Sequence, residues 1–207
     1  MDKNNTNNDT DMKIFNSSDS HDDSDIKIFS SSNKESEITK DHSFNIINQE
    51  LNEQTINGNI SKSKKLGNIF ADMVFIGKDD INTIPLVEKD DIFLNQCRIL
   101  CALTIVVGIE TFAPNHLVAR TSVSNFYESL HNNSPELYKD LEISAAFSFY
   151  FLDIRRGDTN VDEKIGTTFA MLCLQKENPD YIKQGKLLYN NFIQKTEKII
   201  KDMGFIV

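Results

Sequence analysis

Apolar residues are distributed unevenly along the chain of 207 residues. Residues 1–65 consist mainly of Asn, Ser, Asp, Lys, Thr and Glu, and their apolar residues stand alone or in short clusters. Residues 66–207 hold most of the Leu, Val and Phe residues, all five Tyr and all three Cys. A segment with so few side chains to bury cannot offset the entropy lost on folding. We therefore predict a disordered polar and acidic tail over 1–65, followed by a domain over 66–207.

Within the predicted domain, the apolar positions repeat with the period of an α-helix. In the first apolar segment, Leu66, Phe70 and Val74 follow one another at intervals of four residues and would share one helix face. Gly77 is expected to end that helix. Further on, Ser134 and Asn178 each precede a proline, which is the pattern of a capping residue followed by the first helical position.

These signals predict an all-α domain, a single bundle of about five to six helices behind the tail. The helices after the first are expected at about 91–112, 115–131, 135–156, 159–177 and 179–203. The two at 91–112 and 135–156 are the most apolar and are expected to lie at the centre of the bundle.

The longest apolar run, from Ile99 to Ile109, decides whether a membrane span is expected. It is bracketed by Arg98 and Glu110 and is shorter than the roughly 18–20 residues that cross a bilayer. The run therefore favours a buried core helix over membrane insertion. Its β-branched stretch at 104–107 leaves a strand as the alternative secondary structure.

Charge and cysteine content restrict the function classes further. The formal net charge is −9, and both the tail and the domain are acidic. A protein that binds nucleic acid usually presents a basic face, so nucleic-acid binding is not expected, and neither is docking on anionic lipid. Three cysteines do not make a disulfide framework, and no apolar signal segment follows Met1. We expect a cytoplasmic protein.

The tail contains a tandem repeat. DTDMKIFNSS over 9–18 recurs as DSDIKIFSSS over 23–32, with seven of ten positions identical. Two copies of a short motif on a flexible segment are typical of a multivalent binding element, in which Ile and Phe act as anchors or form an added β-strand. The alternative is a duplication within a low-complexity tract. The candidate partner-binding residues are Asp11, Lys13, Ile14 and Phe15, with Asp25, Lys27, Ile28 and Phe29 in the second copy.

In the domain, the candidate pocket residues are Glu110, Glu142, Phe149 and Asp153. Glu110 ends an apolar run, and the other three share the helix predicted at 135–156. Paired carboxylates can perform acid/base chemistry, but they also occur on a solvated helix face that forms ion pairs. The nearby aromatic residues would line an apolar pocket or simply fill the core.

Cys97 and Cys101 are spaced i, i+4 and could face one metal ion, although packing as small apolar residues is favoured. The chain has no glycine-rich phosphate loop, HExxH, CxxC or GxSxG motif. We therefore predict no cofactor and no metal.

No pattern identifies a biochemical activity. The leading hypothesis is a non-enzymatic helical protein-interaction or regulatory module that recruits a protein partner through its tail. One alternative is a small-molecule-binding or enzymatic helical bundle with an aromatic-lined pocket. Another is a membrane-associated helical protein. The sequence does not indicate an oligomeric state.

Overall fold

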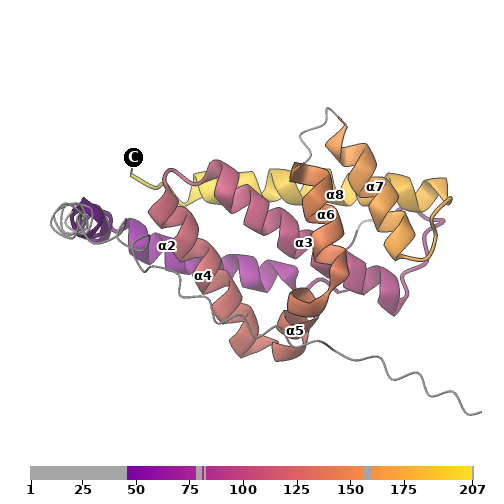
Figure 1. Ribbon diagram of the computed structural model, residues 1–207, viewed down its shortest axis with the longest axis horizontal. Coiled ribbons are helices and arrows are strands. Elements are labelled where there is room, and N and C mark those ends of the chain that lie inside the picture. The colour runs from indigo at the N-terminus through magenta and orange to yellow at the C-terminus, as the bar shows by residue number, and fades with distance from the viewer. Residues whose placement is uncertain (1–45, 78–80, 82, 156–159, 207) are drawn as a thin grey trace, which may run out of the picture. The chain divides into compact units, whose positions relative to one another are not determined.

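The structure is a computed structural model, and wherever its described residues form regular structure they are helical (Figure 1). Residues 47–207 form one compact unit, and the description below concerns that unit. The all-α prediction is confirmed. Residues 1–45 of the predicted disordered tail lie outside the described residues. The described residues are 46–77, 81, 83–155 and 160–206.

The first helix of the predicted domain begins earlier than the apolar pattern indicated. Helix α2 spans Asn59–Val74, and residues 46–56 are also helical. The predicted start at Leu66 was too late because the first turn of α2 is anchored by a polar residue. The side-chain amide of Asn59 is buried, donates to the Ile206 carbonyl at 2.7 Å and accepts from the Ile206 N–H at 3.0 Å. This satisfied amide can lie in the interior without an apolar pattern.

Helix α3 spans Asp91–Phe112 and forms the centre of the core. Asp90 caps it by accepting from the Phe93 N–H at 2.7 Å. The prediction of a buried helix, rather than a strand, is confirmed over 99–109. Among the described residues, α3 is the one helix long and apolar enough to cross a bilayer, but 78% of its most apolar window is buried inside the fold.

The helix predicted over 135–156 is two helices, α5 at Pro135–Ile143 and α6 at Ala145–Arg155. The single-helix prediction is wrong because Ser144 adopts an extended backbone. Its hydroxyl then accepts from the Ala146 N–H at 3.2 Å, as a capping serine does. No glycine or proline marks this break in the sequence, and apolar residues continue on both sides of it. The sequence pattern therefore predicted one helix.

The remaining helices are α4 at His116–Asn133, α7 at Val161–Leu172 and α8 at Pro179–Asp202. The predicted start of α8 is confirmed, since Asn178 caps it by accepting from the Asp180 N–H. Helix α7 ends before the predicted residue 177. Within the described part of the chain there are seven helices, α2–α8, and the segment at 46–56, against the five to six predicted.

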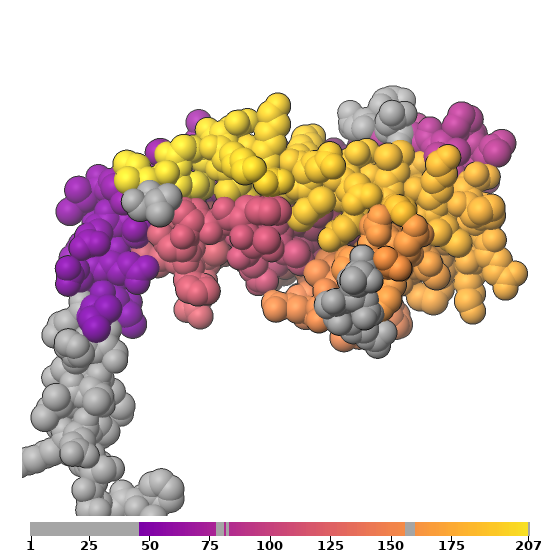
Figure 2. Space-filling model, turned by 90° about the horizontal axis from the view of Figure 1, so that it is seen from above, coloured from indigo at the N-terminus to yellow at the C-terminus, as the bar shows by residue number. Residues whose placement is uncertain are grey.

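Two helix pairs approach backbone to backbone so closely that only a glycine fits between them. A Cβ atom on Gly67 of α2 would lie 2.7 Å from the Phe126 nitrogen of α4. A Cβ atom on Gly166 of α7 would lie 2.5 Å from the Ile182 carbonyl oxygen of α8. We call these two places the glycine crossings. Figure 2 shows α8, in yellow, lying against the orange α7.

Candidate functional site

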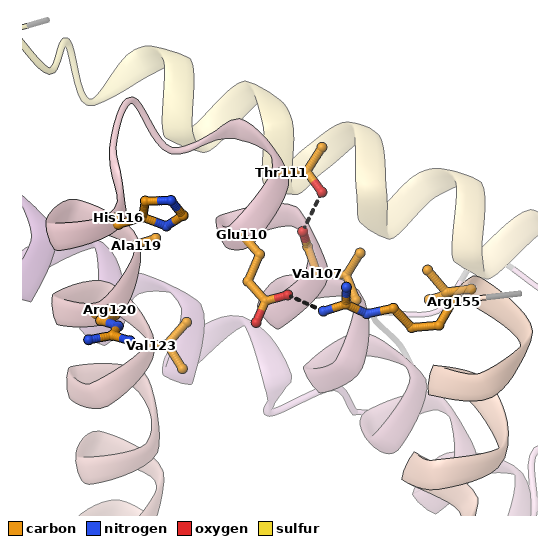
Figure 3. Close-up of a pocket in the computed structure, with 9 residues that line it drawn as sticks. Val107, Glu110, Thr111, His116, Ala119, Arg120, Val123 and Arg155 are labelled. Carbon is orange, nitrogen blue, oxygen red and sulfur yellow. Dashed lines mark hydrogen bonds and ion pairs between the residues drawn. The ribbon is translucent and has the colours of Figure 1, made fainter. Parts of the chain in front are cut away.

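A tight turn brings the end of α3 beside the start of α4. Pro114 follows the last residues of α3, and proline cannot continue a helix because it lacks an N–H. Asn115 then starts α4 by accepting from the Val118 N–H at 2.9 Å. The last turn of α3 and the first turns of α4 therefore face each other, with the end of α6 near them (Figure 3).

A cleft of about 540 Å³ lies between these three helices, and we call it the α3–α4–α6 cleft. Figure 3 shows Glu110 of α3 between the α4 side chains and Arg155 of α6. Its lining combines apolar side chains with ionisable side chains. The lining residues are Val107, Glu110, Thr111, His116, Ala119, Arg120, Val123, Ile154 and Arg155.

The ionisable groups of the cleft are partly solvated. Arg155 donates to the Glu110 carboxylate at 3.2 Å, and these side chains are 62% and 49% exposed. The Arg155 guanidinium also lies 5.0 Å from the centre of the Phe151 ring. An ion pair this exposed contributes little to stability because water screens it. The Thr111 hydroxyl donates to the Val107 carbonyl at 2.7 Å, so it is engaged by the main chain of its own helix.

Of the predicted pocket residues, the cleft contains only Glu110. Glu142 is exposed on α5, beyond the break at Ser144. Asp153 lies on α6 and accepts from the Thr168 hydroxyl at 2.6 Å, a contact that joins α6 to α7. The helix break thus separates Glu142 from the face that carries Asp153, and the predicted carboxylate cluster does not line this cleft.

The aromatic residues near Phe149 do not line the cleft either. Phe149 itself is 47% exposed, whereas Tyr150 and Phe126 are fully buried in the core. Tyr150 and Phe126 are therefore core residues, Phe149 is exposed, and none of the three lines this cleft. A separate hollow of about 480 Å³ is lined in part by Phe75 and Phe192, neither of which is among the predicted pocket residues.

The cysteines behave as buried apolar side chains. Cys97, Cys101 and Cys173 are free thiols in the core. Burial raises the pKa of all three, that of Cys101 and that of Cys173 to about 12, because a thiolate loses its hydration there. Among the described residues, no three His, Cys, Asp or Glu side chains gather as a metal site would require.

Sequence reasoning missed the lining residues other than Glu110, among them the three other ionisable ones, His116, Arg120 and Arg155. His116 and Arg120 are spaced i, i+4 at the start of α4, a weak signal that they share one helix face. Arg155 carried no signal, because its place in the cleft depends on where α6 ends. The candidate partner-binding residues of the tail, Asp11 to Phe15 and Asp25 to Phe29, lie outside the described residues.

Comparison with known proteins does not assign the chain to a family. No protein-family model matches the chain, and no curated protein and no solved structure matches it.

Proposed function

We propose that the folded unit is a small-molecule-binding helical module, and that its α3–α4–α6 cleft receives the apolar part of the ligand. The cleft itself supports this proposal most directly. Its volume of about 540 Å³ falls within the range of pockets that hold small organic molecules. Val107, Ala119, Val123 and Ile154 supply an apolar lining, and burying an apolar group against them is favourable.

The polar groups of the cleft favour binding over catalysis. The Thr111 hydroxyl is bonded to the main chain, and Glu110 is paired with Arg155. A nucleophile needs a base within hydrogen-bond reach, and neither group is placed in such a pair. The ionisable groups instead suit the orientation of a bound molecule, because they stand beside an apolar lining.

The direct test uses N-phenyl-1-naphthylamine, a neutral apolar probe that becomes fluorescent when it leaves water. We expect the full chain to bind one probe with saturable fluorescence. Ala119→Phe places a large side chain in the cleft and should weaken probe binding by at least about tenfold. Circular dichroism and Tm measurements would establish that this variant still folds. If it does not, Val123→Leu fills the cleft more gently.

The matched control is Ala145→Phe, the same substitution at an exposed position of α6 outside the cleft lining. It should leave probe binding unchanged. The proposal fails if the probe does not bind, or if folded cleft-filling variants bind it as the unchanged chain does.

The tandem repeat favours a second candidate function, recruitment of a protein partner by the tail. We infer it from the two copies of D-[ST]-D-x-K-I-F, each with an Ile-Phe pair that could anchor in a partner pocket. Changing both Phe15 and Phe29 to Ala should abolish capture of any partner that depends on the repeat. The outcome that contradicts recruitment is an unchanged set of captured proteins.

A further inference from the structure

Arg120 of α4 borders two hollows. Besides the α3–α4–α6 cleft, it lines a smaller hollow of about 310 Å³. Lys64 of α2 contributes to that second hollow, and the rest of its lining belongs to α4. The α4 residues are Arg120, Thr121, Ser124, Asn125 and Glu128. A ligand long enough to pass Arg120 could therefore occupy the cleft with one end and the second hollow with the other.

The second hollow differs from the cleft in its charge. In the cleft, the Arg155 guanidinium is paired with Glu110. The side chains of Lys64 and Arg120 make no hydrogen bond or ion pair with any residue that the structure describes, and the same holds for the hydroxyls of Thr121 and Ser124. Glu128 is the one carboxylate among the lining residues. Two cations that make no ion pair, two hydroxyls and one carboxylate thus line one hollow of a protein whose net charge is −9.

We propose that the ligand is an amphiphile with a phosphomonoester head group. Its apolar chain lies in the α3–α4–α6 cleft and its head binds Lys64 and Arg120. This inference rests on the proposed function, because it assigns the charged end of the same ligand. A phosphomonoester carries close to two negative charges near neutral pH and three acceptor oxygens. Two cations and two hydroxyls match that group better than they match a carboxylate with one charge.

Competition against N-phenyl-1-naphthylamine tests the head group. Decyl phosphate, decanoate and decanol share one chain length and differ in their charge, so each is titrated below its micelle concentration. We expect decyl phosphate to displace the probe about tenfold more tightly than decanol, with decanoate between them. Added NaCl should narrow the gap, since the head group and both cations are exposed to screening.

The cationic residues are tested by the double variant Lys64→Gln with Arg120→Gln. In this variant, decyl phosphate should displace the probe no more tightly than decanol does. Lys65→Gln, which removes a lysine next in sequence but outside both hollows, is the matched control and should keep the preference.

The outcomes separate the two proposals. If the probe binds in the cleft but decyl phosphate and decanol compete equally, the head-group inference is overturned while the proposed function stands. Equal affinity of decanoate and decyl phosphate overturns the choice of a phosphomonoester. If cleft-filling variants do not affect the probe, the proposed function fails and the inference fails with it.

Discussion

The glycine crossings and the α3–α4–α6 cleft are opposite solutions to the packing of helices. At the crossings, Gly67 and Gly166 let one backbone approach another so closely that a single added carbon atom would collide. At the cleft, helices that meet through branched and charged side chains leave about 540 Å³ unfilled. Protein interiors are usually packed as densely as organic crystals. We therefore expect the closely packed crossings to contribute more to stability than the cleft, which holds unfilled volume.

Tight and open packing thus occur at different places within one small unit. Helices α7 and α8 meet at Gly166 without room for a methyl group, whereas the contacts of α6 with α3 include those of individual side chains. Among these, Tyr150 donates to the Gln96 side-chain carbonyl at 3.3 Å. We therefore expect substitutions at the crossings to change stability and substitutions at the cleft to change binding.

The largest expected effect is unfolding by alkali, which tests the closely packed core. The thiols of Cys97, Cys101 and Cys173 and the phenol of Tyr150 have raised pKa values because they are buried. Their ordinary values are 9.0 for the thiols and 10.0 for tyrosine. The unfolded chain releases these protons at lower pH than the folded chain does. These groups therefore leave the free energy of unfolding unchanged below about pH 9. They lower it as the pH rises further.

Each thiol should cost about 1.4 kcal/mol per pH unit once the unfolded form is ionised. By about pH 11 the three thiols together would therefore lower the free energy of unfolding by about 8 kcal/mol, a large part of the stability of an ordinary protein. Urea titrations from pH 8 to 11 measure the slope. Cys101→Ala should reduce it by about 1.4 kcal/mol per pH unit. A free energy of unfolding that stays constant up to pH 11 would mean that water reaches these groups in the folded protein.

Gly166→Ala is the next largest perturbation, since it forces a methyl group into the Ile182 backbone. We expect a loss of about 1–3 kcal/mol or more in the free energy of unfolding, and a similar loss for Gly67→Ala. Ser148→Ala on the exposed face of α6 provides a control that should change little. Chemical denaturation checks both, and a Gly166→Ala variant as stable as the unchanged chain would remove the contrast between the two regions.

Tyr150→Phe tests how firmly α6 is held to α3. It deletes the buried hydrogen bond to Gln96 and leaves that acceptor unsatisfied, so a loss of about 1 kcal/mol is expected. Tyr138→Phe is matched to it, because the Tyr138 hydroxyl has no hydrogen bond within the described residues. Equal stability of these two variants in urea titrations would show that the hydrogen bond does not secure α6.

The smallest effect is expected for Glu110→Gln at the cleft. It removes an ion pair whose partners are 49% and 62% exposed, so the free energy of unfolding should change by at most about 0.5 kcal/mol. A thermal denaturation series in low and high salt measures it. A loss above about 1 kcal/mol would show that the cleft carries stability as the crossings do.

Most of the fold could be predicted because several of its helices begin with local signals, although Ser134, the residue before α5, makes no capping hydrogen bond with its side chain. Asp90, Asn115 and Asn178 are capping residues whose side chains accept main-chain N–H groups in the structure. Prediction failed at Ser144, where a serine breaks an apolar stretch without glycine or proline. It failed again at Asn59, where a buried amide starts a helix.

The cleft could not be predicted in the same way, because no local pattern encodes unfilled volume. It exists only where the end of α3, the start of α4 and the end of α6 meet, so residues as distant in sequence as Val107 and Arg155 contribute to it. Glu110 was singled out because it ends an apolar run. Arg120 lies on a helix of ordinary amphipathic pattern, and its position between two hollows follows from the crossing of α4 with α2.

The paired hydrogen bonds between Asn59 and Ile206 join residues 147 positions apart. Since these positions touch, a short peptide could link them and close this stretch of chain into a ring. The ring could then be reopened at the exposed turn around Leu174 to Lys176, between α7 and α8. Such a circular permutant would keep every helix pair while reversing which end of the chain is made first, so the order in which the helices form could be separated from the structure that they reach.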